Sequence, residues 1–468
     1  MMKRISQSTK QQRGKTPTLT RRDLLRGAGA TIAAATLVPR HVLGAGYLAP
    51  SQKVALAGVG VGGVGHGQLQ GCQSAGFDVV VLCDVDDVYA KKSFDKWPEA
   101  RRYRDYREML DAEGDKIDAV YCGTPDHSHA VICTAVSRKK KHLCCVKPLT
   151  RTIHESRAVV AAAVESGMAT QVTASPNTSD AACRTCELIW AGAIGPVREV
   201  HIWSNRPLWP QGMMTPDWRD PVPSTFDWDL WLGPAAERPF ANEWPEGHYA
   251  VAQVNARSAR RAVYHPWNFR GWWAFGTGAL GDMGCHHLNT PYRALKLEYP
   301  TSVSASATKT FAETAPLASI VTYDFPARGD MPPVRVVWYD GGIKPLCPKE
   351  LGGRSLPGSG ELYIGDEGVM LESNVFPEAR AKQFADVPKT LPRRSGTWGE
   401  WWEACHGGEQ AGCHFEWAGL LTEFVLLGNI AIRSGKKLDW DGEALEATNC
   451  PEAARFIRRE YRKGWDFS

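Results

Sequence analysis

Short apolar runs and helical patterns alternate along the chain after a basic N-terminal segment. The runs expected to form strands span residues 53–57, 79–83, 117–122, 142–146 and 169–173. Apolar runs of this length without alternation are typical of parallel strands buried on both faces of a sheet. With a helix predicted over residues 153–166, the pattern indicates an α/β domain over residues 47–173.

The hydrophobic period changes after this domain. A helix is predicted over residues 178–191, where Gly192 and the pair Gly195-Pro196 give stop signals. Half-buried strands, several of them alternating, are predicted over residues 197–204, 301–310, 319–325, 334–339 and 361–372. Residues 174–468 are therefore expected to form an α+β domain with an open, mostly antiparallel sheet covered by helices.

A glycine motif follows the first predicted strand directly. Gly58, Gly60 and Gly63 have the spacing G-x-G-x-x-G, Gly62 lies inside it, and Asp84 ends the second predicted strand. This combination is the fingerprint of a Rossmann dinucleotide-binding domain, in which the glycines permit the turn, the approach of pyrophosphate and the helix–strand packing. Asp84 can accept hydrogen bonds from ribose and repels a 2′-phosphate, which favours NAD over NADP. The alternative is a glycine-rich turn without a ligand.

Two more loops are expected to face the nucleotide, because ligands of open α/β sheets lie beyond the carboxyl ends of the strands. The third predicted strand leads into Thr124, Pro125 and His129, and the fourth leads into Lys147. All four residues are therefore candidate cofactor contacts.

Residues 1–46 are predicted to be an export signal. They contain nine Lys or Arg and one acid, and an Ala-rich run from Gly27 to Pro39 that is too short for a permanent membrane helix. Residues 20–26 resemble a twin-arginine signal, which exports folded proteins, so a periplasmic or otherwise exported protein is expected; a disordered basic tail is the alternative. Folding before export suits an enzyme that must collect its nucleotide in the cytoplasm.

Composition excludes several classes of partner. The chain carries a formal charge of +4 and its first 46 residues carry +8, so the remainder carries −4 and no nucleic-acid partner is expected. No later segment is expected to span a bilayer. Thirteen scattered cysteines do not indicate a disulfide framework. Cys183 and Cys186 lie in a helical pattern without a second ligand pair, so we expect no metal site.

The motifs occur in the order and spacing of the Gfo/Idh/MocA oxidoreductases, which the chain resembles over nearly its whole length. Besides the glycine motif and Asp84, the resemblance rests on Thr124-Pro125, Lys147-Pro148 and residues 191–197, 227–234, 281–286 and 458–465. The signal resembles that of the exported branch of the family. The resemblance implies a nucleotide-binding domain, an open-sheet domain through which subunits associate, and activity on sugars or cyclitols.

The resemblance also implies three residues at the reacting centre, Lys147, Asp282 and His286, the last two as D-x-x-x-H. Their spacing puts Asp282 and His286 on one face if this segment is helical. Imidazole titrates nearest neutral pH and is the natural general base. We expect Asp282 to orient it while Lys147 binds the substrate oxygen. A buried core histidine is the alternative for His286, and His287 is expected to be structural or a substrate contact.

Three positions depart from the family pattern. Val146 stands where a Glu precedes the Lys-Pro pair, residues 174–177 replace an Asn-Gln pair, and Asn289 replaces the last acid of D-x-x-x-H-x-x-D. These departures affect the prediction of nucleotide binding less than they affect any prediction of a particular substrate.

Tryptophan is concentrated in one segment, because nine of the 18 lie between residues 203 and 273. Aromatic faces beside Arg, His and Asn suit a sugar pocket, where rings stack and polar groups bind hydroxyls. His265, Trp267, Arg270 and Trp272 are therefore candidate substrate contacts. Packing of long loops against the sheet is the alternative.

Three functions remain open. An exported dehydrogenase meets no replenished NAD pool, so the first hypothesis is a sugar oxidoreductase whose bound NAD is reset on the protein. The second is a redox-neutral NAD-dependent glycoside hydrolase or lyase that uses transient oxidation and elimination. The third is a carbohydrate-binding protein that retains the nucleotide without catalysis, for which Val146 and Ala174 are the best support.

Overall fold

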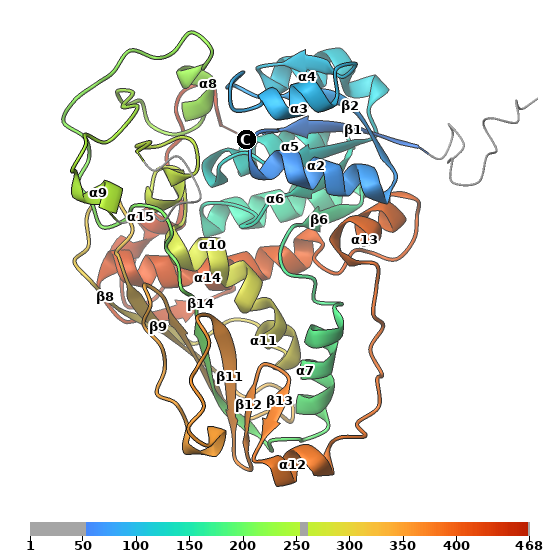
Figure 1. Ribbon diagram of the computed structural model, residues 1–468, viewed down its shortest axis with the longest axis vertical. Coiled ribbons are helices and arrows are strands. Elements are labelled where there is room, and N and C mark those ends of the chain that lie inside the picture. The colour runs from blue at the N-terminus through green and yellow to red at the C-terminus, as the bar shows by residue number, and fades with distance from the viewer. Residues whose placement is uncertain (1–52, 253–260, 467–468) are drawn as a thin grey trace, which may run out of the picture. The chain divides into compact units, whose positions relative to one another are not determined.

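Six parallel strands form the first sheet of the structure, a computed structural model that describes residues 53–252 and 261–466 (Figure 1). The predicted export signal, residues 1–46, lies outside the described residues. The strands are β1 (Val54–Val59), β2 (Phe77–Cys83), β3 (Arg101–Tyr103), β4 (Ala119–Cys122), β5 (His142–Cys145) and β6 (Thr170–Val172). Their order is β3-β2-β1-β4-β5-β6, with every pairing parallel. The direction of strand addition reverses between β1 and β4, and ligands of such sheets bind beside that point.

Helices pack on both faces of this sheet. They are α2 (Val64–Ala75), α3 (Lys91–Lys96), α4 (Tyr106–Glu113), α5 (His129–Arg138) and α6 (Ile153–Ser166). Neighbouring residues of β4 enter different cores: Val120 packs in a cluster with Ile132 and Leu143, whereas Tyr121 packs with Leu56 and Leu69. Because both faces are apolar, the strands read as continuous apolar runs, as the sequence predicted.

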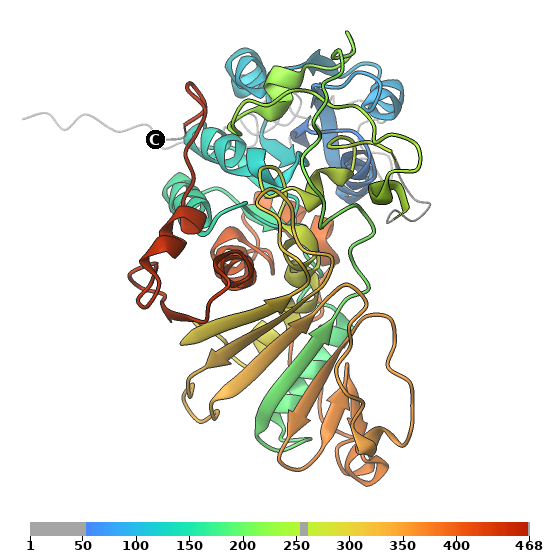
Figure 2. The same ribbon diagram turned by 90° about the vertical axis from the view of Figure 1, so that its left-hand side faces the viewer.

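The second sheet is open and has nine strands in the order β13-β12-β11-β7-β10-β9-β8-β14-β15 (Figure 2). The strands are β7 (Val197–Trp203), β8 (Ser302–Ala307), β9 (Ser319–Phe325), β10 (Val334–Tyr339), β11 (Gly360–Gly365), β12 (Val369–Leu371), β13 (Asn374–Phe376), β14 (Leu438–Asp441) and β15 (Glu446–Ala447). Only the pairing of β7 with β10 is parallel among those described. The mostly antiparallel sheet that the sequence predicted is confirmed.

One predicted strand is wrong in detail. Residues 361–372 form two antiparallel strands, β11 and β12, and the amide of Gly365 donates to the carbonyl of Gly368 across the turn. A Cβ atom at Gly365 would lie 2.1 Å from the carbonyl oxygen of Ile194. The turn therefore needs glycine at this close approach, a requirement that the apolar pattern does not reveal.

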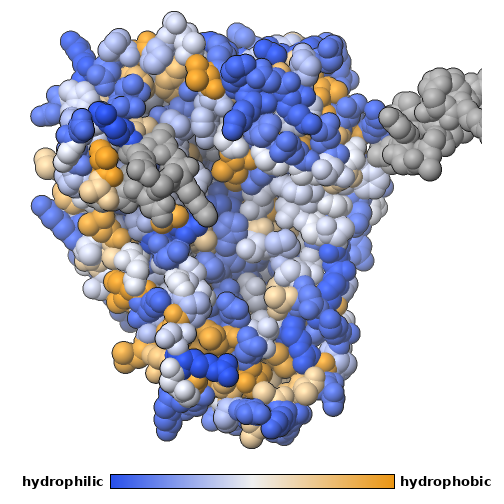
Figure 3. Space-filling view, viewed as in Figure 1, coloured by the Kyte–Doolittle hydropathy of each residue, from blue (hydrophilic) through white to orange (hydrophobic). Residues whose placement is uncertain are grey.

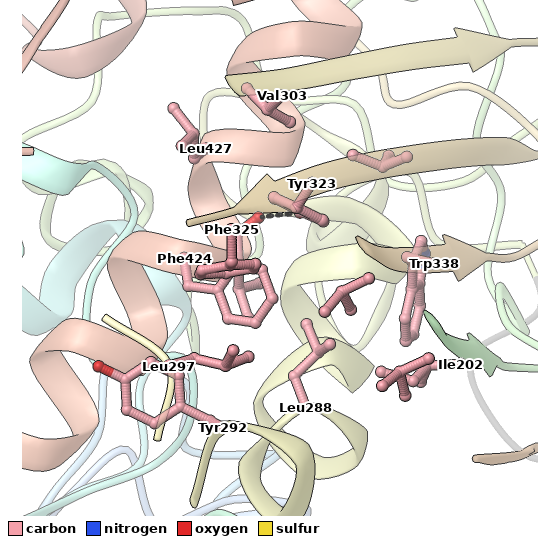
Figure 4. Close-up of a cluster of buried hydrophobic side chains, with 14 of the residues drawn as sticks. Ile202, Leu288, Tyr292, Leu297, Val303, Tyr323, Phe325, Trp338, Phe424 and Leu427 are labelled. Atoms are coloured by element: carbon pink, nitrogen blue, oxygen red, sulfur yellow. Dashed lines mark hydrogen bonds between the residues drawn. The ribbon is translucent and has the colours of Figure 1, made fainter. Parts of the chain in front are cut away.

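Helices cover one face of the second sheet. They are α7 (Asp180–Trp190), α10 (Gly278–His287), α11 (Asn289–Ala294) and α14 (Phe415–Ser434). Tyr323 and Phe325 of β9 pack against Phe424 of α14, and the same cluster includes Leu288, between α10 and α11, and Tyr292 of α11 (Figure 4). This aromatic core fixes α10, the helix that carries the D-x-x-x-H motif.

The C-terminal part of the chain returns to the first sheet. Helix α13 (Gly396–Cys405) contacts α2 and β6, and α14 contacts α6. Contrary to the prediction for later segments, α14 is long and apolar enough to cross a membrane by length and composition. However, 83 % of its apolar window is buried inside the protein, because it packs against α6, α10 and β8. The burial explains its composition, since a helix between two sheets needs apolar residues around most of its circumference.

The remaining short elements lie in connections and near the chain end. They are α8 (Trp228–Leu232), α9 (Tyr249–Ala252), α12 (Glu378–Gln383), α15 (Ala454–Ile457) and the 3-10 turns η3 (Gly114–Lys116), η4 (Asp126–Ser128), η5 (Asn268–Gly271), η6 (Lys349–Leu351) and η7 (Pro451–Ala453).

Candidate functional site

A pocket lies at the carboxyl end of the first sheet, where the loops after β1, β2, β4 and β5 meet. Of the predicted cofactor residues, Gly60, Gly62, Asp84, Thr124, Pro125 and Lys147 line it. Because the sheet order separates β2 from β5 by two strands, Asp84 and Lys147 lie on opposite sides of the β1–β4 junction. Figure 3 shows that the molecular surface is hollowed near its middle, with mainly hydrophilic residues around the hollow.

The glycine turn brings two loops and a helix into contact. Gly60 has φ +75°, and a Cβ atom there would lie 2.6 Å from the amide nitrogen of Thr124, so glycine lets the β1 and β4 loops touch. A Cβ atom at Gly58 would lie 2.9 Å from Leu69 of α2, and one at Gly65 would lie 2.1 Å from the Gly60 carbonyl oxygen. Gly58 and Gly65 therefore perform the helix–strand packing that the sequence assigned to Gly63.

Gly63 instead is the N-cap residue that precedes α2, with φ +50° and no side-chain cap. The Tyr89 ring covers the turn here, since a Cβ atom at Gly62 would lie 2.2 Å from Tyr89 Cδ1 and one at Gly63 would lie 1.9 Å from Tyr89 Oη. Tyr89 lines the pocket, and burial raises the pKa of its hydroxyl. No sequence signal pointed to Tyr89. The uncapped amide groups of the first turn of α2 suit an anion.

Asp84 is 8 % exposed and connects the end of β2 to the glycine turn. Its Oδ2 accepts hydrogen bonds from the amides of Val61 (2.8 Å) and Gly62 (3.0 Å), and its Oδ1 accepts one from the amide of Asp86 (3.1 Å). Burial raises the pKa of Asp84 although these amides oppose the shift. Nearby Arg104 also lines the pocket and is paired with Asp87.

His129 corrects a predicted cofactor contact. It is fully buried, its two ring nitrogens each lie 2.8 Å from a carbonyl oxygen, those of Pro148 and Thr124, and it does not line the pocket. The His129 ring therefore links the loop after β4 to the loop after β5 without lining the pocket. It helps to position Lys147 through the neighbouring residue Pro148.

Lys147, Asp282 and Arg270 form a charged cluster beside the pocket. Lys147 Nζ donates to the carbonyl oxygen and to Oδ1 of Asp282, both at 2.6 Å, and Arg270 Nε donates to the same Oδ1 at 2.9 Å. Burial opposes ionisation of Asp282, but the charges of Lys147 and Arg270 outweigh it and hold the pKa of this carboxyl well below its ordinary value.

His286 lies one turn after Asp282 on α10, as the spacing predicted. Its Nδ1 lies 3.1 Å from Ser175 Oγ, and the structure describes no hydrogen-bond partner for its Nε2. Burial and the charge of Lys147 lower its pKa to about 3, so the imidazole is neutral at neutral pH. The predicted orientation of the ring by Asp282 is thereby corrected, because the carboxylate binds two cations and Ser175 holds the ring.

Ser175 is held in turn by Asn289. The Asn289 side-chain amide donates to the Ser175 carbonyl oxygen at 2.7 Å, and its oxygen accepts from Trp417 Nε1 at 2.8 Å. Both positions belong to the departures from the family pattern. They did not look functional in the sequence because 111 residues separate Ser175 from His286.

The predicted substrate residues divide into three groups. Trp267 and Arg270 line the pocket, with the guanidinium carbon 4.1 Å from the Trp267 ring centroid. His265 also lines it, but its Nε2 lies 3.2 Å from Asp86 Oδ2, near Asp84 rather than beside His286. Trp272 is fully buried and donates to the Val263 carbonyl oxygen, so its prediction as a substrate contact is wrong.

His287 points toward the second sheet. Its Nδ1 lies 4.0 Å from Glu361 Oε1 on β11. Burial lowers the pKa of His287 to about 4 and raises that of Glu361 to about 8, so the pair is uncharged at neutral pH. His287 is therefore separate from the charged cluster.

Most of the tryptophan-rich segment packs in a core of its own, which includes Trp228, Trp244 and Trp272. Trp231 lines the pocket, and so does Trp465, which belongs to the segment that returns to the first sheet. The packing alternative thus holds for most tryptophans. Trp465 could not be assigned from its neighbours in the sequence.

Three buried cysteines on β4, α5 and β5, namely Cys122, Cys133 and Cys145, have sulfur atoms within 4.8 Å of one another. This group offers three ligands in the described part of the chain, one fewer than a structural zinc site uses. Cys183 and Cys186 are both buried in the core.

Two family models match the chain. The model described as the NAD-binding Rossmann fold of an oxidoreductase family, Gfo/Idh/MocA, matches residues 52–174, and the model of the family's C-terminal alpha/beta domain matches residues 209–325. These matches agree with the two sheets and with the expected resemblance.

Curated relatives match shorter stretches. Inositol 2-dehydrogenase of Salmonella typhimurium is 27 % identical over 116 residues, which cover 25 % of this chain and 34 % of that protein. Levoglucosan dehydrogenase of Pseudarthrobacter phenanthrenivorans is 34 % identical over 91 residues, covering 19 % of this chain and 23 % of that protein. The chain thus matches about a third of the length of these relatives, or less.

Solved structures share the fold over most of the chain. The WlbA dehydrogenase from Bordetella pertussis, in complex with NADH and UDP-GlcNAcA, superimposes with a TM-score of 0.54 at 13 % identity, covering 83 % of this chain and 99 % of that one. Aldose-aldose oxidoreductase from Caulobacter crescentus gives a TM-score of 0.51 at 16 % identity, covering 83 % and 100 %. At these identities the likeness establishes the fold.

Proposed function

Because the chain belongs to the Gfo/Idh/MocA oxidoreductase family, we propose that it is an NAD-dependent enzyme that oxidises a secondary hydroxyl group of a sugar or sugar derivative. One observation carries the proposal: Lys147, in the loop after β5, and Asp282, in α10, form a buried ion pair at 2.6 Å. Beside this pair lies the neutral imidazole of His286, whose Nε2 has no hydrogen-bond partner among the described residues.

The pocket fits a dinucleotide by its chemistry. The uncapped start of α2 suits the pyrophosphate, and Asp84 suits ribose hydroxyls and disfavours a 2′-phosphate. The family description and the NADH of the WlbA complex support NAD. When bound, NAD supplies the acceptor for the hydride that leaves the substrate carbon.

Residues of this chain would accept the proton that leaves the substrate hydroxyl group. His286 Nε2 accepts it from the substrate hydroxyl, because burial keeps the imidazole neutral and Ser175 fixes the ring through Nδ1. Lys147 donates a hydrogen bond to the substrate oxygen and stabilises its developing negative charge. Asp282 and Arg270 position the ammonium group for this contact.

Two observations support a sugar as the substrate, namely the activities of the matched relatives and the residues that line the pocket. The matched curated relatives are dehydrogenases of inositol and levoglucosan, both polyhydroxylated rings. Trp267 and Arg270 offer an aromatic face and a directional donor at the pocket. A sugar ring can stack on the first while its hydroxyls bind the second.

We further propose that NAD stays bound and is reset on the protein. The twin-arginine-like segment implies export to a compartment without a replenished NAD pool. Tyr89 over the glycine turn and Trp465 from the C-terminal segment are in position to enclose a nucleotide. Association of subunits through the open face of the second sheet belongs to the same proposal, and light scattering of the purified protein tests it.

Two measurements test the proposed activity. Denaturing the purified protein should release NAD, and mixing the native protein with a panel of free sugars should change the nicotinamide absorbance. Release of an aglycone from glycosides without net reduction, with solvent deuterium entering the sugar, would favour glycoside cleavage instead. Protein that releases no nucleotide and responds to no sugar would contradict the proposal.

A further inference from the structure

A second pocket lies between α14, α15 and the connection that follows β8. It is lined by three aromatic residues, Trp273, Phe311 and Phe456, and by two arginines, Arg433 and Arg455, and no acidic residue is among its lining residues. It shares no lining residue with the nucleotide pocket. An adjoining cavity shares Trp273, Arg433 and Phe456 and leads toward Arg151.

The cations of this pocket stack on its rings. The guanidinium carbon of Arg433 lies 4.1 Å from the Phe456 ring centroid and 5.3 Å from that of Trp273. Arg455 lies 4.6 Å from the Phe456 centroid. A guanidinium carries five N–H donors, and its contact with an aromatic ring leaves them available to an anion.

The positive charge here is not balanced by a contact. Within residues 53–252 and 261–466, neither Arg433 nor Arg455 has an ion pair or a hydrogen bond through its side chain. Burial lowers the pKa of Arg433 to about 10, although the charge of Glu313 opposes the shift, so the group stays protonated. Glu313 itself is paired with Arg238 at 2.9 Å. A half-buried guanidinium without an anion is a preorganised site for one.

We propose that this pocket binds a carboxylate-bearing sugar. The carboxylate would accept hydrogen bonds from Arg433 and Arg455, and the pyranose ring would pack on the exposed part of Phe311. A simple inorganic anion would use the arginines but not the rings, whereas a neutral sugar would use the rings but leave the arginines unbalanced. The inference is independent of the proposed function, because it involves other residues.

Calorimetric titration of the full chain at constant ionic strength tests the proposal, with glucuronate, glucose and inorganic phosphate as probes. We expect saturable binding of glucuronate, and binding of glucose and of phosphate that is weaker by about tenfold or more. Phosphate that binds as well as glucuronate would overturn the assignment of a sugar ring. Absence of glucuronate binding would overturn the proposal altogether.

Variants locate the binding. Arg433→Met keeps much of the apolar stem and should weaken glucuronate binding about tenfold or more. Arg455→Met should act in the same direction without risk to folding, because Arg455 is exposed. Arg458→Met removes a nearby exposed arginine and is the matched control, with unchanged binding expected.

Binding at the nucleotide pocket must be distinguished from binding here. Lys147→Ala should leave glucuronate binding unchanged if the second pocket is the site, whether or not the proposed oxidation occurs. If Lys147→Ala abolishes binding while Arg433→Met and Arg455→Met do not, the proposal is overturned.

Discussion

Asp84, which lines the pocket, and Asp282, which binds the pocket residues Lys147 and Arg270, are two equally buried carboxylates, each 8 % exposed. Their surroundings shift their pKa values in opposite directions. Asp84 accepts hydrogen bonds from backbone amides, and burial raises its pKa. Asp282 touches Lys147 and Arg270, and their charges lower its pKa despite the burial. The comparison teaches that charged neighbours, not burial alone, decide in which direction the pKa of a buried carboxyl group shifts. In our account Asp84 selects the cofactor and Asp282 organises the reacting centre.

The largest expected effect comes from neutralising Asp282. Asp282→Asn leaves Lys147 and Arg270 without their shared anion, and we expect kcat to fall about 10²- to 10³-fold because the ammonium is no longer positioned. Steady-state kinetics on the sugar that gives the strongest response would measure it.

Asp180→Asn is the matched control for this variant. Asp180 also touches two cations, Lys389 and Arg393, but it is exposed and is not among the residues that line the pocket. Its kcat should be unchanged. A normal kcat in Asp282→Asn would contradict the role assigned to that residue.

A smaller effect is expected on the other side of the pocket. Asp84→Ser removes the negative charge that disfavours a 2′-phosphate, so the preference for NAD over NADP should fall about 10- to 100-fold. Dissociation constants for both nucleotides, measured on protein freed of its native nucleotide, would show this. An unchanged preference for NAD over NADP would mean that Asp84 only stabilises the glycine turn through its hydrogen bonds to the backbone.

Ser175 tests a further difference, because its hydroxyl group, and not the Asp282 carboxylate, makes the hydrogen bond to His286. Ser175→Ala should lower kcat about tenfold through loss of ring orientation, with little change in bound nucleotide. Ser175→Thr keeps the hydroxyl and should restore most of the activity. If Ser175→Ala and Ser175→Thr have the same kcat, loss of the hydroxyl hydrogen bond to His286 is not the cause of the lower activity.

The smallest expected effect is on stability as a function of pH. The folded-state pKa of Asp282 lies below its unfolded value, so its contribution is present above the unfolded pKa and is lost as pH falls through the folded pKa. The folded-state pKa of Asp84 is raised, so its charge lowers stability at neutral pH and that cost disappears on acidification. For each of Asp282→Asn and Asp84→Asn, the difference in free energy of unfolding from the unmodified protein can be measured as a function of pH. We expect these two differences to change with pH in opposite directions. Slopes of the same sign would contradict the comparison.

Local signals explain what the sequence could predict. The helix expected over residues 153–166 has the same bounds as α6, because Thr152 and Glu155 form a capping box at its start and Gly167 adopts the left-handed conformation at its end. Asp84 follows the strand it was expected to follow, since the glycine turn and the next strand are close in sequence. Lys147 and Asp282, which are 135 residues apart, were paired only through the family resemblance.

The remaining features depend on contacts that no local pattern records. Tyr89 reaches the glycine turn and Trp465 reaches the pocket from the end of the chain. Trp272 was assigned to the pocket because its neighbours are polar and aromatic, yet the same composition builds the buried aromatic core around it. Composition identifies the segment but not which ring faces solvent.

A single-turnover experiment tests the central claim most directly. Protein that carries its own bound nucleotide is mixed rapidly with the responding sugar, and the nicotinamide absorbance is followed in the unmodified protein, Lys147→Ala and His286→Gln. We predict reduction in the unmodified protein and reduction slowed about 10²- to 10⁴-fold in both variants at equal nucleotide content. Equal rates in all three proteins would contradict the assignment of Lys147 and His286 to the reacting centre.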